Sequence, residues 1–347
     1  MEFNIAVPQH DELAIGILGR FARLNGMTST KWAIQALRVA ARDTSFTGTI
    51  SLIAQACGMN TGEFTGKHSM LPLSNPIVKT TEEARDWFAG HPILSRKGLS
   101  TSVPMLRWCP VCAKDNLIER GFSHWQRAHQ ISGLDWCPHH KVPLYEAPME
   151  SSISHPGRLQ GHCAHTVFPD AELHNHALLR LHRIQLALLV RQRPVHIDTW
   201  TRVVRKRCAE RDLRIAEVGK RLVASDLIRA QFPSTWLERH MPEVAAKTPG
   251  AYIRKIDGAC IDRHVCYPSL ACAAILAALF DSEERALTLL GEQHKETHSQ
   301  ANIDGAENRA IESFLRGDDI KTACKAHGVT LAAFGTRLRE RHSAISV

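Results

Sequence analysis

Residues 107–112 read Arg-Trp-Cys-Pro-Val-Cys, and residues 137–140 read Cys-Pro-His-His. The first stretch holds a Cys-x-x-Cys pair and the second a Cys-x-x-His pair, with residues 113–136 between them. Two such pairs, each on a tight turn, direct four soft ligands at one tetrahedral ion. The sequence therefore predicts a zinc ribbon or knuckle whose ligands are Cys109, Cys112, Cys137 and His140.

Four protein ligands leave no open position for water, so we expect the zinc to be structural and not catalytic. Two more histidines of this segment are rival ligands. His139 competes with His140, but the Cys-x-x-His spacing favours His140. His129 is a further candidate, although the other four residues already complete a tetrahedron. Trp125 is expected to pack in the core of the ribbon.

A second metal site is a weaker prediction. Residues 150–176 are rich in histidine, and His162, Cys163 and His165 lie close together in the sequence. Without a further Cys-x-x-Cys pair, a solvated histidine-rich loop explains this stretch as well as a second zinc does.

The composition restricts the class of protein. The chain has 347 residues, 43 Lys and Arg against 35 Asp and Glu, and ten Cys. A net charge of +8 suits a polyanionic partner. No apolar run is long enough to span a membrane, and we expect no signal peptide and a cytoplasmic, nucleoid-associated protein. Thiols stay reduced there, so we expect the cysteines outside the metal site to pack as small apolar residues; these include Cys57, Cys208, Cys260, Cys272 and Cys324.

Apolar residues recur mostly at helical spacing, so the predicted fold is mainly α. Three segments share a further pattern: a small residue, a glycine four positions later, and a bulky apolar residue six positions after that. A helix-turn-helix needs this pattern, because the helices cross closely, the glycine turns and the bulky residue anchors the second helix. An ordinary helical hairpin is the alternative for each. The three sets are Ala22-Gly26-Trp32, Ala54-Gly58-Phe64 and Cys324-Gly328-Phe334.

Two groups of polar residues are candidates for nucleic-acid contact, with an ordinary solvated helix face as the alternative. The first lies in a basic segment at 201–221, and the second on the last helix of the chain. The candidates are Arg202, Arg205, Lys206, Arg207, Arg211 and Arg214 in the first group and Thr330, Arg337 and Arg339 in the second.

Motifs of common enzyme classes are missing from the sequence. We find no phosphate-binding loop, no Gly-x-Ser-x-Gly elbow, no His-Glu-x-x-His helix and no deaminase pattern. The chain is therefore not expected to be an enzyme.

Several stretches together resemble the TniQ/TnsD family of transposition proteins. The central one combines Cys109-Pro110-x-Cys112 with the pattern Trp125, His129-Gln130, Gly133, Cys137-Pro138-x-His140. Others are Asp11-Glu12-Leu13, the run 67–72, and the pair 267–270 and 279–282. The length resembles the shorter TniQ forms. Predicted domains are a helix-turn-helix domain at 1–90, a zinc-ribbon module at 91–170, a helical bundle at 171–295 and a terminal helix-turn-helix at 296–347.

The resemblance implies a non-catalytic adaptor that selects the target of a transposon. Such proteins engage attachment-site DNA or an RNA-guided CRISPR Cascade complex, and they recruit an AAA+ ATPase that brings the transposase. The shorter forms that bind Cascade pair as homodimers. A zinc-containing helix-turn-helix transcription regulator is the alternative, and a zinc-dependent hydrolase or nuclease is a weaker one. No membrane partner is expected.

Overall fold

The structure is a computed structural model. It describes residues 3–41, 48–80, 99–159, 165, 167–215, 218–219, 221–260 and 267–291, and in the terminal part 309–316, 318–327, 329–331, 334–335 and 338. The chain divides into two compact units, Met1–Gly291 and Glu292–Val347. Helices dominate both units, which confirms the mainly α class.

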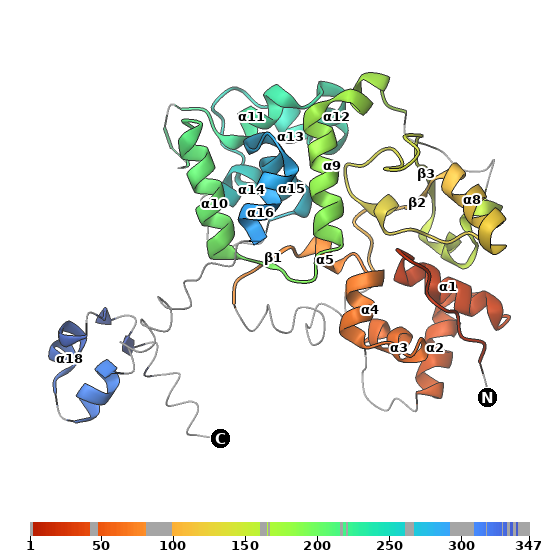
Figure 1. Ribbon diagram of the computed structural model, residues 1–347, viewed down its shortest axis with the longest axis horizontal. Coiled ribbons are helices and arrows are strands. Elements are labelled where there is room, and N and C mark those ends of the chain that lie inside the picture. The colour runs from red at the N-terminus through yellow and green to blue at the C-terminus, as the bar shows by residue number, and fades with distance from the viewer. Residues whose placement is uncertain are drawn as a thin grey trace. The chain divides into compact units, whose positions relative to one another are not determined.

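Two helix pairs form the N-terminal part of the first unit (Figure 1). Each pair turns at the glycine that the sequence predicted, with φ of 68° at Gly26 and 67° at Gly58. This left-handed backbone favours glycine because a Cβ is unfavourable there. Phe64 is fully buried, as expected of the anchor of the second pair. The helices are α1 (Ala14–Leu24), α2 (Thr30–Ala40), α3 (Thr49–Ala56) and α4 (Thr61–His68).

The anchor of α2 was predicted wrongly. We expected Trp32 to hold this helix in place, but its side chain is 65% exposed. Ala33 and Leu37, which lie four positions apart and so share one face of the helix, are buried instead. The helix starts from a cap at Ser29, whose Oγ accepts the backbone N–H of Trp32 at 3.3 Å.

A short connector follows. It contains α5 (Leu71–Ser74) and strand β1 (Ile77–Val78). A further short helix, predicted at 81–88, lies outside the described residues.

The segment that holds the cysteine motifs combines a two-stranded sheet with one helix. Strand β2 pairs antiparallel with β3, so that Leu106 lies opposite Ala147 and Trp108 opposite Tyr145. The elements are β2 (Leu106–Trp108), α8 (Pro110–Arg120), the 3-10 turns η1 (Ala128–Gln130), η2 (Met149–Ile153) and η3 (Pro156–Arg158), and β3 (Tyr145–Ala147). Here we expected a helix or turn at 116–130; α8 begins earlier and ends at Arg120.

The helical domain surrounds α15 (Ser269–Leu279), whose residues from Ala271 onward are all buried. A helix that is apolar on every side belongs in a core, and α15 packs against α9, α10, α11, α14 and α16 (Figure 1). This confirms the predicted core helix at 268–280. The other elements are η4 (Asp170–His174), α9 (His176–Leu189), β4 (Val195–His196), α10 (Ile197–Glu210), α11 (Ala224–Gln231), α12 (Ser234–His240), α13 (Pro242–Ala245), α14 (Arg254–Asp257), η5 (Gly258–Cys260) and α16 (Glu283–Gly291).

Two features tie this domain to the rest of the first unit. Strand β4 pairs in parallel with β1, with Val195 opposite Ile77, and α9 packs against α5. Cys208, Cys260 and Cys272 are buried free thiols inside the domain, as predicted. Among the described helices, none is long and apolar enough to cross a membrane.

The terminal unit has its own small core of Ala310, Ile311, Cys324 and Phe334. Helix α18 (Ile320–Ala326) starts at Asp319, whose carboxylate accepts the backbone N–H groups of Lys321 and Thr322. The predicted helix start is therefore confirmed. Ile320, expected to face inward, is 40% exposed, which leaves Ala323 and Cys324 as the buried residues of this helix.

Candidate metal centre

Strand β2 and helix α8 position the first ligand pair. Cys109 follows the strand and is the N-cap of the helix, and its Sγ accepts the backbone N–H of Cys112 at 3.5 Å. Pro110 fits the first turn, where a backbone N–H has no helical partner. The start of the helix therefore brings both sulfur atoms to the same side.

A tight turn at 137–142 positions the second pair. The backbone N–H of His140 donates to Cys137 Sγ at 3.4 Å, and that of Lys141 donates to the Cys137 carbonyl at 2.9 Å. Lys141 closes the turn with a φ of 58°. In both pairs, the backbone N–H of the second ligand therefore donates to the first cysteine sulfur.

The four ligand atoms lie at the corners of a tetrahedron. Nδ1 of His140 is 3.6 Å from Cys109 Sγ, 3.3 Å from Cys112 Sγ and 3.6 Å from Cys137 Sγ. The sulfur atoms of Cys112 and Cys137 are 3.6 Å apart. Tetrahedral zinc bonds correspond to edges of about 3.8 Å between two sulfur atoms and about 3.6 Å between sulfur and nitrogen. The spacing fits one metal ion at the centre, and all four atoms lie within 4.8 Å of one another.

The two rival histidines occupy different positions. His139 is exposed, and its ring centroid lies 6.5 Å from that of His140. His129 is buried beside the centre, with Nε2 3.6 Å from Cys137 Sγ and 3.9 Å from Cys112 Sγ. His140 approaches three sulfur atoms and His129 only two of them at hydrogen-bonding distance, so His140 completes the tetrahedron. The Nε2 atom of His129 lies near the sulfur atoms of Cys112 and Cys137 but is not one of the four atoms of the tetrahedron.

Asp115 adds a carboxylate that the sequence motifs did not reveal. It sits one turn into α8, and its Oδ2 lies 3.4 Å from Nε2 of His140. A histidine that binds metal through one nitrogen commonly directs the other at a carboxylate, which fixes the ring and strengthens the ligand. This pairing supports Nδ1 of His140 as the ligand atom.

Three thiols converge in this space, and a cation is needed for all three to be deprotonated at once. The neighbouring sulfur atoms of Cys109 and Cys137, together with burial, raise the pKa of Cys112 well above its ordinary value. Three thiolates so close together repel one another unless a metal ion neutralises them, and a metal also deprotonates its thiol ligands. A closed Cys3His set of this kind is typical of structural zinc.

A protein-family model, TniQ, matches residues 5–144. The chain contains a TniQ domain. The matched segment covers both N-terminal helix pairs and all four metal ligands, and it confirms the family resemblance seen in the sequence. Among curated proteins, none matches the chain.

The other motifs of the TniQ domain meet where the N-terminal helices contact the metal module. Asp11 accepts the guanidinium of Arg127 at 3.0 Å and the backbone N–H of Ala128 at 3.0 Å. Arg127 also donates to the carbonyls of Gly66 and Ser69. Trp125 is buried and donates its indole N–H to the carbonyl of Ser154, which confirms its packing role. These contacts hold the helix pairs and the metal module in one unit.

Gly133 lies at a close approach between the TniQ domain and the helical domain. It adopts a φ of 82°, and a Cβ built there would lie 2.9 Å from Leu270 and 3.0 Å from Trp236. Its carbonyl accepts the ring N–H of His182 at 3.0 Å and the indole N–H of Trp236 at 2.9 Å. Burial lowers the pKa of His182 to about 4, so this ring is neutral at pH 7. Gly133 therefore permits two helices to reach the backbone of the loop.

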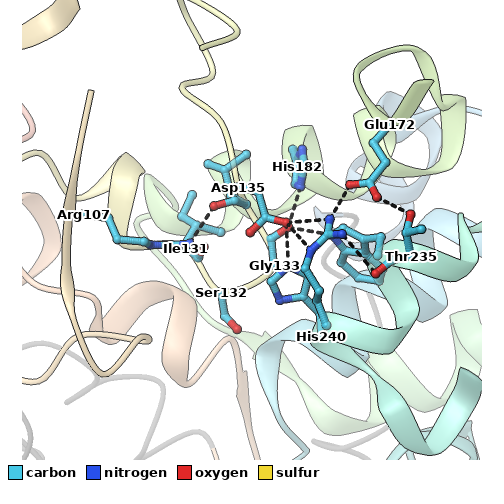
Figure 2. Close-up of polar contacts among 12 residues, drawn as sticks. Arg107, Ile131, Ser132, Gly133, Asp135, Glu172, His182, Thr235 and His240 are labelled. Carbon is cyan, nitrogen blue, oxygen red and sulfur yellow. Dashed lines mark hydrogen bonds and ion pairs between the residues drawn. The ribbon is translucent and has the colours of Figure 1, made fainter. Parts of the chain in front are cut away.

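A charged network lies next to this contact (Figure 2). Oδ2 of the buried Asp135 accepts Nη2 of Arg239 at 3.0 Å and faces Nε2 of His240 at 2.7 Å. Arg239 also pairs with the buried Glu172, which accepts the hydroxyl of Thr235. Burial alone raises the pKa of Asp135, but His240 and Arg239 outweigh it and hold the pKa below its ordinary value. Asp135 stands two residues before Cys137, so the network joins the metal module to α12.

The six basic residues predicted between 202 and 214 fall into two groups. Three are used inside the fold: Arg207 binds Glu210 and the carbonyl of Leu279, Arg211 binds Asp281, and Arg214 binds the carbonyls of Gly219 and Gly250. The other three, Arg202, Arg205 and Lys206, are exposed and form no ion pair with any described residue. These three alone present free cationic groups on α10.

The remaining predicted positions are mostly outside the described residues. These are His162 and Cys163 of the second metal prediction, and Arg337 and Arg339 of the last helix. His165 is exposed and lies beside Tyr145, and Thr330 is exposed in the terminal unit. Among the described residues, one cluster of possible metal ligands is present, the one at Cys109.

Proposed function

We propose that this protein is a non-catalytic targeting adaptor of a transposon, which connects a target to an AAA+ ATPase and through it to the transposase. The TniQ domain at 5–144 is the observation that carries this proposal. That domain fits a role associated with transposition. In this proposal the protein works in the cytoplasm, at the nucleoid, as a homodimer.

The proposal assigns the metal centre a structural role and identifies the ion as zinc. Four protein atoms surround the ion position, which leaves no place for a substrate or an activated water. The ligands also sit at structural junctions: Cys109 starts α8, and Cys137 follows the loop that α9 and α12 contact. A metal at this position stabilises the arrangement of α8, the loop before Cys137, and the helices α9 and α12 that contact this loop.

Target contact is assigned to exposed cations. Arg202, Arg205 and Lys206 lie exposed on one face of α10 and form no ion pair with any described residue. Such groups bind phosphate oxygens without reading sequence, so they suit attachment-site DNA and the guide RNA of a Cascade complex equally. The exposed cations therefore do not distinguish targeting through attachment-site DNA from targeting through a Cascade complex.

A transposition assay tests the adaptor role. A marked transposon is supplied with its ATPase and transposase, with and without this protein, and insertion sites are sequenced. We expect insertions at a defined target only when the protein is present. Insertion of the same frequency and distribution without it would contradict the proposal. Such a result, combined with autonomous sequence-specific duplex binding, would favour the transcription regulator instead.

The α10 surface is tested separately by binding to a labelled duplex and to a labelled RNA over a series of salt concentrations. Replacing Arg202, Arg205 and Lys206 by Ala removes three cations and is expected to reduce the salt slope by about 2 to 3, at roughly 0.7 to 0.9 per phosphate contact. The control variant replaces three exposed cations on other helices, Lys114, Arg254 and Lys255. Equal losses in both variants would show a diffuse charge effect and no α10 contact.

A further inference from the structure

A cavity of about 420 Å³ lies beside the metal centre and belongs neither to the ion site nor to α10. One wall is the last turn and a half of α8, and the opposite wall is the end of α9. The rest of its lining consists of His10, Asp11, His124, Gln126, Ala128 and His139. Its volume falls in the range of about 300–1,000 Å³ that ligand sites occupy.

The α8 side of this groove carries polar groups without partners. His124 is 7% exposed, and its Nδ1 has no hydrogen-bond partner. Burial, then the charges of Arg120 and Arg20, lowers the pKa of His124 to about 4, so the ring is neutral. The other ring nitrogen bonds the backbone of His10, which leaves Nδ1 as an acceptor.

Asn116 is the second such group. It is 8% exposed, and its amide forms no hydrogen bond with the described residues. Buried polar groups in folded proteins are normally paired, so the fully buried and unpaired Nδ1 of His124 in this cavity indicates an external partner. An amide can both donate to and accept from a peptide group, and the His124 ring can accept a backbone N–H.

The charge and the apolar wall define the rest of the partner. Arg120 lines the groove, where its Nη1 donates to Oε1 of Gln9 at 3.1 Å and its Nε lies 3.9 Å from a carboxylate oxygen of Glu119. The carboxylate of Asp11 is engaged by Arg127 and the N–H of Ala128. The α9 wall consists of Leu186, Leu189 and Val190, of which Val190 is 58% exposed. The groove therefore combines one partly engaged cation, two polar side chains and an apolar surface.

We propose that this groove binds an extended peptide segment of a partner protein, with one acidic side chain next to apolar ones. Asn116 and His124 hold the peptide backbone, Arg120 pairs with the acidic side chain, and the α9 wall takes the apolar side chains. A nucleic acid fits less well, because the neutral His124 offers an acceptor and the opposite wall offers no donors to phosphate. The targeting proposal does not require this groove, so each can fail without the other.

Fluorescence anisotropy of labelled peptides with the full-length, metal-loaded protein tests the inference. The probe is a library of fluorescein-labelled decapeptides with a central Glu between Leu and Val positions, compared with the same library carrying Gln. We expect saturable binding of Glu peptides and weaker binding of Gln peptides. Removing a hydrogen bond to a charged group is expected to weaken binding by about tenfold to a hundredfold.

Four variants distinguish the groove from other surfaces. Arg120→Ala and Asn116→Ala should each weaken binding, and Ala187→Phe should do so by filling the groove while leaving the polar groups in place. Lys114→Ala removes an exposed cation from the same helix outside the groove and should leave binding unchanged. Metal content and thermal unfolding of each variant verify the fold, and Ala187→Phe decides the question if the α8 variants lose it.

Three results would overturn the inference. The first is an absence of saturable binding by every Glu peptide. The second is a loss in Lys114→Ala that equals the loss in Arg120→Ala. In the third, the groove variants keep peptide binding but lose another interaction. Loss of duplex binding would assign the groove to nucleic acid, and loss of self-association in sedimentation would assign it to a second copy of the chain.

Discussion

Gly133 offers the sharpest test of how the TniQ domain contacts the helical domain. The substitution Gly133→Ala adds one methyl group at a φ of 82°, within 2.9 Å of Leu270 and 3.0 Å of Trp236. The Leu270 contact is with Cδ1, the flexible end of a side chain that can turn away, whereas the rigid Trp236 ring or the loop must give by a few tenths of an ångström. A shift of the loop also disturbs the carbonyl that accepts from His182 and Trp236.

The expected loss has two separable parts. A side chain in the left-handed region costs roughly 1–2 kcal/mol, and overpacking of a filled core costs roughly 1–3 kcal/mol. Gly121, which ends α8 with a φ of 74°, has nothing within 4 Å of an added Cβ. Gly121→Ala therefore carries the backbone cost alone. The difference between the two variants, about 1–3 kcal/mol, measures the close approach.

Urea unfolding of the metal-loaded protein, followed by tryptophan fluorescence, measures both variants. Trp236 lies against the substituted position and reports locally. We expect Gly133→Ala to be clearly less stable than Gly121→Ala at equal metal content. If the two variants lose the same free energy of unfolding, the packing of Trp236 and Leu270 against this loop is refuted.

Three further predictions follow from the metal centre and the buried histidine. His140→Ala should reduce the zinc content measured by atomic absorption, whereas His139→Ala should retain one equivalent of zinc. If both variants retain one equivalent, the fourth ligand is His129 and not His140. Asp115→Asn should weaken zinc affinity by about 10- to 100-fold in a chelator competition, and an unchanged affinity would remove the carboxylate from the site. The folded-state pKa of His182, about 4, lies below the unfolded value near 6.5, so the unfolded chain binds the proton first. The free energy of unfolding should fall by up to about 3 kcal/mol as the pH drops from roughly 6.5 to 4. In the variant His182→Gln, this pH dependence should become flatter. If the variant shows the same pH dependence as the unmodified protein, the ring of His182 is already accessible to protons in the folded state.

Local patterns in the sequence were sufficient for the metal ligands and the core helix. The spacing of Cys109 and Cys112 fixes one helix start, and the spacing of Cys137 and His140 fixes one turn, so proximity in sequence becomes proximity in space. The helix at 269–279 is apolar on every side, and such a segment has no exposed face to offer.

Contacts between distant segments could not be predicted from local sequence patterns. Trp32 was predicted to anchor α2 because it occupies the bulky position of the helix-turn-helix spacing, but Ala33 and Leu37 form the buried face of that helix and Trp32 is exposed. Arg207 looked equivalent to Arg205 in a basic run, yet it reaches back to the carbonyl of Leu279 and lies over the ring of Phe280. A net charge count cannot separate cations that stabilise a fold from cations that remain free.

The metal centre lies at the point where the helices, the loop and the groove depend on the same short segment. Its first ligand starts α8, which carries Asp115 toward His140 and Asn116 toward the neighbouring groove. Its third ligand follows Asp135, whose carboxylate contacts Arg239 and His240 of α12. An ion held by these four ligands would restrain the loop that carries Gly133, at the junction of the TniQ domain with the helical domain.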